Sequence, residues 1–180
     1  MPDELAGFVE AREIAALVAE QLARRSLKLV LAESCTAGLT AALLGTVPGI
    51  SSWFCGSAVT YREAVKVAWL GLDADTLQEV TAVSEYASAE MARGVLQRTD
   101  EANISAAITG HLGPDAPPSI DGVCFIAVAL RTPSLPAADQ TNIRWLHQSR
   151  VQLVTTTRML RQHEAAQRML EAVLTSMQSM

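Results

Sequence analysis

The chain has 180 residues, of which 49% are hydrophobic and 18% are charged. This composition is typical of a compact globular protein and excludes a disordered chain. The formal net charge of −5 lacks the basic excess of a nucleic-acid-binding domain, so no nucleic-acid partner is expected. No apolar run reaches the ~18 residues of a membrane span, and the acidic N-terminus is unlike a signal peptide. We therefore expect a single domain over 1–180, with no membrane partner and a cytoplasmic location.

The hydrophobic pattern changes along the chain between the periods of helices and strands. In chain order it predicts a helix over 4–25, a strand over 28–32, a helix over 36–44, a strand over 53–61, short helices over 63–70 and 74–79, a helix that begins after Ser84, strands over 103–109, 122–131 and 143–147, and a helix over 151–178. The last two strands are expected to pair as a hairpin across a surface connection at 132–141. The alternation elsewhere indicates an α/β fold, a three-layer α/β/α arrangement with a mixed β-sheet.

The turn that follows the first predicted strand is the first candidate site. Ser34, Cys35 and Thr36 form a small polar cluster between that strand and an apolar helix. The N–H groups at the start of a helix can hold an anion, and a hydroxyl beside them can act as a nucleophile. Ser34 or Thr36 would serve equally well as a helix cap, and Cys35 could itself be the nucleophile. The three cysteines lack the close pairing of a zinc site, so no metal site is expected.

Several further short motifs follow this turn at fixed positions. They are Val47-Pro-Gly-Ile-Ser51, Val59-Thr-Tyr61 with Lys66 five residues on, Ala82-Val-Ser84 and Thr109-Gly110-x-x-Gly-Pro114, all after Ala32-Glu-Ser-Cys-Thr-Ala-Gly38. In this order and spacing they resemble the CinA C-terminal domain family. The resemblance covers nearly the whole chain, and it is specific because several unrelated motifs agree.

The resemblance implies a nicotinamide mononucleotide deamidase, which hydrolyses the carboxamide to nicotinic acid mononucleotide and ammonia without a cofactor. It implies Ser34 as the nucleophile and Tyr61 and Lys66 as further catalytic residues. A serine hydroxyl needs a base within hydrogen-bond reach, and a lysine can serve if burial lowers its pKa. Tyr61 could relay the proton or hold the leaving amide. Taken alone, a tyrosine at a strand end usually packs, and a lysine on a short helix is usually solvated.

The resemblance places substrate binding on the first turn, on the glycine-containing loop and on one arginine. These residues are Cys35, Thr36, Ala37, Gly38, Thr109, Gly110, Gly113 and Arg150. Backbone N–H groups at the start of the 36–44 helix are expected to stabilise the oxyanion. Arg150 is expected to bind the phosphate from a turn, Gln148-Ser149-Arg150, before the last helix, with His111 as a possible additional donor.

The chain departs from the family pattern where the substrate should bind. Ala37 replaces a glycine, Glu63 replaces an asparagine, Val154 replaces an arginine, and the loop at 111–121 is shorter and lacks a lysine. These departures favour the alternative, a catalytically silent relative that binds a nucleotide or a protein partner without turnover.

The expected partner is a small mononucleotide amide. The resemblance and the apolar last helix also indicate a homodimer or a higher homo-oligomer.

Overall fold

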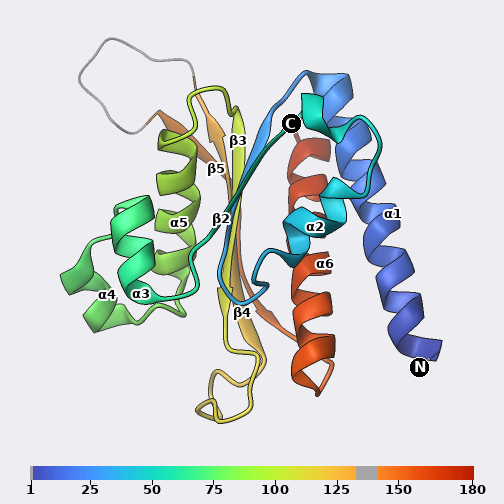
Figure 1. Ribbon diagram of the computed structural model, residues 1–180. Helices are drawn as coiled ribbons and strands as arrows, with labels where there is room; N and C mark the ends of the chain where they lie inside the picture. The colour runs from blue at the N-terminus through green and yellow to red at the C-terminus, as the bar shows by residue number, and fades with distance from the viewer. Residues whose placement is uncertain (1, 133–141) are drawn as a thin grey trace.

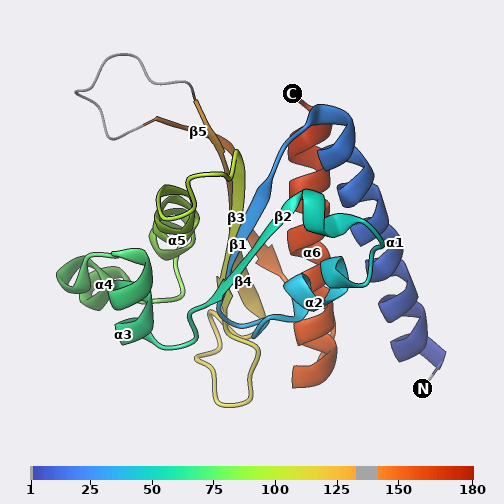
Figure 2. The same ribbon diagram turned by 45° about the horizontal axis from the view of Figure 1, so that its top comes forward.

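The structure is a computed structural model that describes residues 2–132 and 142–180. Its helices are α1 (Pro2–Arg25), α2 (Leu39–Gly45), α3 (Glu63–Val65), α4 (Ala74–Val80), α5 (Glu85–Gln97) and α6 (Arg158–Gln178), and its strands are β1 (Leu29–Glu33), β2 (Phe54–Val59), β3 (Ile104–Gly110), β4 (Val123–Arg131) and β5 (Ile143–Gln152). The five strands form one sheet in the order β2-β1-β3-β4-β5. Helices α1, α2 and α6 cover one face of the sheet, and α3, α4 and α5 lie on the other (Figures 1 and 2). The predicted three-layer α/β/α fold with a mixed sheet is confirmed.

The parallel half of the sheet brings three chain segments to one edge. Strand β1 pairs in parallel with β2 and β3, and Glu33 at its end lies opposite Val59 and Ile108. Strands β3, β4 and β5 pair antiparallel, so the predicted hairpin is confirmed. Because parallel strands end at the same edge, the segments that follow β1, β2 and β3 converge there. In Figure 1 this edge lies at the bottom, beside the first turn of α6.

Strand β1 is buried on both faces and separates two hydrophobic layers. Its side chains alternate, so that Leu29 and Leu31 belong to the core beneath α1, α2 and α6. Val30 and Ala32 belong to the core beneath α5. Burial on both faces explains the uninterrupted apolar run that predicted this strand.

The largest differences from the predicted boundaries are at the start of α6, at the end of β5 and at the start of α2. Helix α6 begins at Arg158 rather than at residue 151, because β5 runs to Gln152 and the threonines at 155–157 are weak helix formers. Thr157 caps α6, accepting a hydrogen bond from the backbone N–H of Leu160. Helix α2 begins at Leu39 rather than at residue 36. The connection expected at 132–141 lies outside the described residues, except for residue 132.

The short helix predicted over 63–70 has two parts. Helix α3 covers its first residues, and a π-helix (η2, Lys66–Leu70) continues from it. Single turns of π-helix are frequent at functional sites, since the wider turn changes the direction in which a side chain points. Lys66 is the first residue of this turn.

Gly94 on α5 allows close packing against η2. A Cβ atom at position 94 would lie 2.2 Å from the carbonyl oxygen of Leu70. We expect Gly94→Ala to lower the free energy of unfolding by roughly 1–3 kcal/mol, because the added methyl overpacks this contact. The control is Gly7→Ala on α1, where a Cβ would meet nothing within 4 Å. It should raise stability by roughly 0.5–1 kcal/mol through better helix propensity. Denaturant titration measures both, and equal stability of the two variants would contradict the close packing.

Candidate functional site

Ser34 and Lys66 form a hydrogen-bonded pair in the interior. Ser34 lies in the turn directly after β1, and its Oγ accepts a hydrogen bond from Lys66 Nζ at 2.8 Å. The same amine donates to the carbonyl oxygen of Thr60 at 2.7 Å. Ser34 is 7% exposed and Lys66 only 1%. Lys66 is therefore not the solvated surface lysine that its position on a short helix would usually indicate.

Burial lowers the pKa of Lys66 to about 8, because transfer out of water disfavours the charged ammonium. Electrostatic interactions with Cys35 and Glu63 act in the opposite direction and raise this pKa by less. The amine is therefore neutral in about one molecule in ten at pH 7 and in about half of the molecules at pH 8. A neutral amine beside a hydroxyl meets the requirement for a general base.

The thiol of Cys35 contacts Cys124, whereas the hydroxyl of Ser34 contacts Lys66. Its Sγ lies 4.0 Å from Sγ of Cys124 on β4, and both residues are buried. The contact with Cys35, together with burial, raises the pKa of the Cys124 thiol. Since the amine of Lys66 contacts Ser34 Oγ, the geometry favours Ser34 over Cys35 as the nucleophile.

The first N–H groups of α2 are already occupied. The backbone N–H groups of Thr40 and Ala41 each donate to the carboxylate of Glu33 at 3.0 Å. They cannot act as the oxyanion donors that were expected from this helix. The backbone N–H groups of Cys35 and Thr36 have no hydrogen-bond partner among the described residues. Donors for an oxyanion are therefore present one turn earlier, beside Ser34 itself.

The predicted catalytic residues share one cavity. Ser34, Tyr61 and Lys66 line a cavity of ≈ 600 Å³ at the edge where the three parallel strands end. Three of the expected substrate-binding residues also line it: Cys35, Thr109 and Gly110. A second cavity of ≈ 720 Å³ lies alongside and is lined by Gly113 and the loop that follows it.

The other expected binding residues lie outside the lining of these two cavities. The hydroxyl of Thr36 donates to Glu33. Ala37 and Gly38 form the turn before α2, with φ angles of 53° and 93°. Arg150 lies within β5, so the interpretation of Gln148-Ser149-Arg150 as a turn is wrong. The guanidinium of Arg150 donates to the carbonyl oxygen of Ser119 on an exposed part of the surface.

Arg158 is a cavity residue that the sequence analysis missed. It is the first residue of α6, and it lines both cavities. Its guanidinium donates to the hydroxyl of Tyr61 at 2.7 Å and to the carbonyl oxygen of Gly113. Tyr61 is 52% exposed, and its hydroxyl contacts Arg158 rather than Ser34 or Lys66. Thr157 is a typical helix cap before an apolar periodic segment. Taken as the cap, it would have placed Arg158 at the first position of the last helix.

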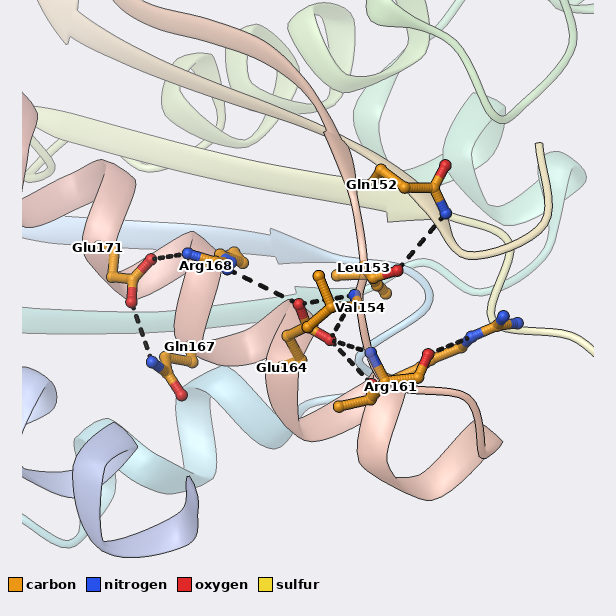
Figure 3. A network of polar contacts seen from close by, with 9 residues as sticks. Gln152, Leu153, Val154, Arg161, Glu164, Gln167, Arg168 and Glu171 are labelled. Carbon is orange, nitrogen blue, oxygen red and sulfur yellow. Dashed lines mark hydrogen bonds and ion pairs between the residues drawn. The ribbon is translucent and has the colours of Figure 1, made fainter. Parts of the chain in front are cut away.

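A polar network holds the segment that leads into Arg158. The carboxylate of Glu164 accepts hydrogen bonds from the backbone N–H groups of Val154 and Thr155, and it pairs with Arg168 (Figure 3). Arg161 donates to the carbonyl oxygen of Thr155 and forms two hydrogen bonds with the carboxylate of Asp121. The network therefore fixes the connection between β5 and α6 on one side and the loop after β3 on the other.

No group of three or more His, Cys, Asp or Glu side chains in residues 2–132 and 142–180 is arranged to hold a metal ion. No helix in that part of the chain is long and apolar enough to cross a membrane.

Comparison with known proteins decides the family. The sequence model of the CinA C-terminal domain family matches residues 11–177 of the chain. The chain belongs to the CinA C-terminal domain family. The resemblance that the short motifs indicated is thus confirmed.

Relatives of this CinA-family chain include longer proteins. A CinA-like protein of Myxococcus xanthus is 38% identical over 158 residues, which cover 86% of this chain and 37% of that protein. A CinA-like protein of Chlorobium limicola is 46% identical over 97 residues, which cover 54% of this chain and 22% of that protein. The chain thus spans well under half the length of these relatives.

Solved structures of the same superfamily share the fold. A competence-damaged protein (CinA) superfamily protein from Klebsiella pneumoniae superposes with a TM-score of 0.82 at 26% identity, covering 94% of this chain and 99% of that one. The competence/damage inducible protein of Agrobacterium tumefaciens gives a TM-score of 0.81 at 26% identity, covering 93% and 95%.

Proposed function

We propose that this CinA-family chain is an amidohydrolase that cleaves the carboxamide of nicotinamide mononucleotide, releasing ammonia. The observation that carries the proposal is the buried hydrogen bond between Lys66 Nζ and Ser34 Oγ, at a cavity lined by both residues. A serine with a base in hydrogen-bond reach is the arrangement that acyl transfer requires. The cavity volume lies within the range typical of small-molecule sites.

The first step is attack by Ser34 Oγ on the carboxamide carbon. The neutral amine of Lys66 takes the hydroxyl proton through its lone pair, while one of its N–H bonds remains directed at the carbonyl oxygen of Thr60. In the ammonium form the amine donates to Ser34 Oγ, and after deprotonation the N–H directed at Thr60 can stay in place while the lone pair accepts the proton of Ser34. The developing oxyanion accepts hydrogen bonds from the N–H groups of Cys35 and Thr36, a contribution of about 3–4 kcal/mol per donor in measured cases.

The second step is collapse of the tetrahedral intermediate. The C–N bond breaks, and the ammonium of Lys66 returns its proton to the leaving nitrogen, so ammonia departs and an acyl-Ser34 ester remains. Water then attacks the ester, with Lys66 again taking the proton. The second tetrahedral intermediate then collapses: the C–O bond to Ser34 breaks, the ammonium of Lys66 returns its proton to Ser34 Oγ, and the acid is released.

The charged groups around the cavity suit a substrate that carries an anion. Arg158, Arg62 and His111 line the cavity together with Lys66. Arg158 stands between the two cavities, where a guanidinium can offer paired N–H donors to a phosphate. In this proposal Arg158 takes the phosphate-binding role that the sequence analysis gave to Arg150.

One observation favours the alternative, a relative that binds without turnover. Glu63 places a carboxylate in the same cavity lining. A carboxylate disfavours a phosphate that lies close to it, so an anionic substrate must bind away from Glu63. Binding of nicotinamide mononucleotide with no ammonia release would support this alternative.

The direct test is ammonia release from nicotinamide mononucleotide by the purified protein. We expect Ser34→Ala and Lys66→Met each to abolish release, because one removes the nucleophile and the other the base. Thermal unfolding of the variants checks that they remain folded. Release that persists in Ser34→Ala would rule out the serine mechanism.

The pH profile should report the titration of Lys66. Activity should rise as pH increases through about 8, because only the neutral amine accepts the proton of Ser34. The negative charge of Glu63 raises this pKa, so Glu63→Gln should shift the midpoint to lower pH. The control Glu79→Gln, on the exposed end of α4, should leave the midpoint unchanged. Equal midpoints in both variants would contradict the role given to Glu63.

Arg158 and Arg150 provide a second matched pair. We expect Arg158→Ala to raise KM for nicotinamide mononucleotide roughly 10- to 100-fold, the usual effect of removing one partner of a charged hydrogen bond. Arg150→Ala should leave KM nearly unchanged. Steady-state kinetics on the two variants distinguishes the two positions, and the reverse pattern would return the phosphate to Arg150.

A further inference from the structure

Glu33 is a buried acidic residue to which the proposed mechanism assigns no part. It is the last residue of β1 and directly precedes Ser34. Its exposure is 0%. Burial of an acidic side chain costs free energy unless hydrogen bonds compensate, so the contacts of this residue require an explanation.

Four donors converge on the carboxylate of Glu33. Its Oε2 accepts from the hydroxyl of Thr36 at 2.8 Å and from the backbone N–H of Thr40 at 3.0 Å. Its Oε1 accepts from the backbone N–H of Ala41 at 3.0 Å and from the hydroxyl of Ser57 at 2.9 Å. Each oxygen thus takes one hydroxyl, which can rotate, and one backbone N–H, which cannot.

The backbone of Glu33 reaches the other half of the catalytic pair. Its carbonyl oxygen accepts from the N–H of Thr60 at 2.8 Å. The carbonyl oxygen of Thr60 in turn accepts from Lys66 Nζ. The side chain of Glu33 therefore fixes the turn that carries Ser34. Its main chain fixes Thr60, whose carbonyl oxygen orients Lys66.

We infer that Glu33 is a positioning residue whose carboxylate holds the Ser34 turn in the geometry that the reaction needs. The side chain ties the start of α2 and the strand β2 to the end of β1, so that Ser34 Oγ faces Lys66 Nζ. It also takes up the N–H groups of Thr40 and Ala41, which leaves those of Cys35 and Thr36 for the oxyanion. This role rests on the proposed function.

The inference requires an acceptor at both oxygen positions. In Glu33→Gln, the amide nitrogen replaces one oxygen and faces either the N–H of Thr40 or that of Ala41. A hydroxyl can rotate and accept a hydrogen bond from the amide, but a backbone N–H can only donate. The N–H of either Thr40 or Ala41 therefore loses its acceptor. The turn then shifts, and Ser34 moves relative to Lys66.

The experiment measures two rates on the full chain. The first is ammonia release from nicotinamide mononucleotide, and the second is covalent labelling of Ser34 by a fluorophosphonate, which needs the activated hydroxyl but not the mononucleotide site. We expect Glu33→Gln to lower kcat and the labelling rate by about 100-fold with little change in KM, the usual effect of a small displacement in a reacting geometry. The midpoint of the pH profile should not move, because Glu33 is not among the groups that shift the pKa of Lys66.

A matched control separates positioning from general stability. Ser105 is equally buried, and its hydroxyl donates to the carbonyl oxygen of Ala92 on α5, away from the cavity lining. Ser105→Ala should lower the melting temperature without lowering the labelling rate. If Glu33→Gln fails to fold, Ser57→Ala and Ser57→Thr on β2 replace it, since the hydroxyl of Ser57 donates to Glu33 Oε1 at 2.9 Å. The alanine variant loses a donor to Glu33 and should label about tenfold more slowly, whereas the threonine variant keeps the hydroxyl and should label at the wild-type rate.

Two contrary results have different meanings. Wild-type labelling in folded Glu33→Gln, or in Ser57→Ala, overturns the positioning role and leaves the proposed function intact. A wild-type protein that reacts with neither the fluorophosphonate nor the mononucleotide overturns the proposed function, and this inference with it.

Discussion

The contact between the amine of Lys66 and the hydroxyl of Ser34 depends on the exclusion of water around it. In water the amine would be charged at neutral pH and would have no lone pair to accept a proton. Burial at the end of three parallel strands lowers its pKa to about 8 and holds it 2.8 Å from Ser34 Oγ. The lysine is itself stabilised in this position by the carbonyl oxygen of Thr60. The topology of the sheet thus supplies both the geometry and the protonation state on which the proposed chemistry rests.

The first turns of α6 form a second scaffold for the same site. Arg158 contacts Tyr61 and the loop after β3, and Gln162 donates to the carbonyl oxygen of Thr36 at 2.9 Å. Glu164 holds the connection that precedes the helix, as Figure 3 shows. The mouth of the cavity is therefore built by residues more than 90 positions apart in the sequence. A change at the start of α6 would reach the substrate and the Ser34 turn together.

The sequence predicted β1 and β4 well because their apolar runs are uninterrupted, but it ended the hairpin strand β5 at residue 147 rather than at Gln152, because polar and apolar residues mix along that strand. It also selected Ser34, Tyr61 and Lys66 as candidates, through motifs whose order is specific to one family, and the three residues line one cavity. The start of α6 was placed too early, because the apolar pattern continues from β5 toward the helix without a strong break. Because of that error the expected phosphate ligand was placed at Arg150, whereas Arg158 is the residue that lines both cavities.

The role of Glu33 could not be predicted from the sequence. Its four donors come from the following turn, from α2 and from β2, and nothing in the local pattern shows that they converge on one carboxylate. The occupied N–H groups of α2 were missed for the same reason. Three of these donors follow Glu33 within eight residues but depend on how the turn folds back, and Ser57 reaches the carboxylate only because β2 pairs with β1.

The protonation state of Lys66 is the central claim, and NMR titration of its side-chain ¹³Cε signal measures it directly. The assignment follows from the signal that disappears in Lys66→Met. We expect a titration midpoint at about pH 8, well below the ordinary lysine value of 10.5. A midpoint at or above 10.5 would show a permanently charged amine at neutral pH and would contradict the proposed role of Lys66 as the base for Ser34.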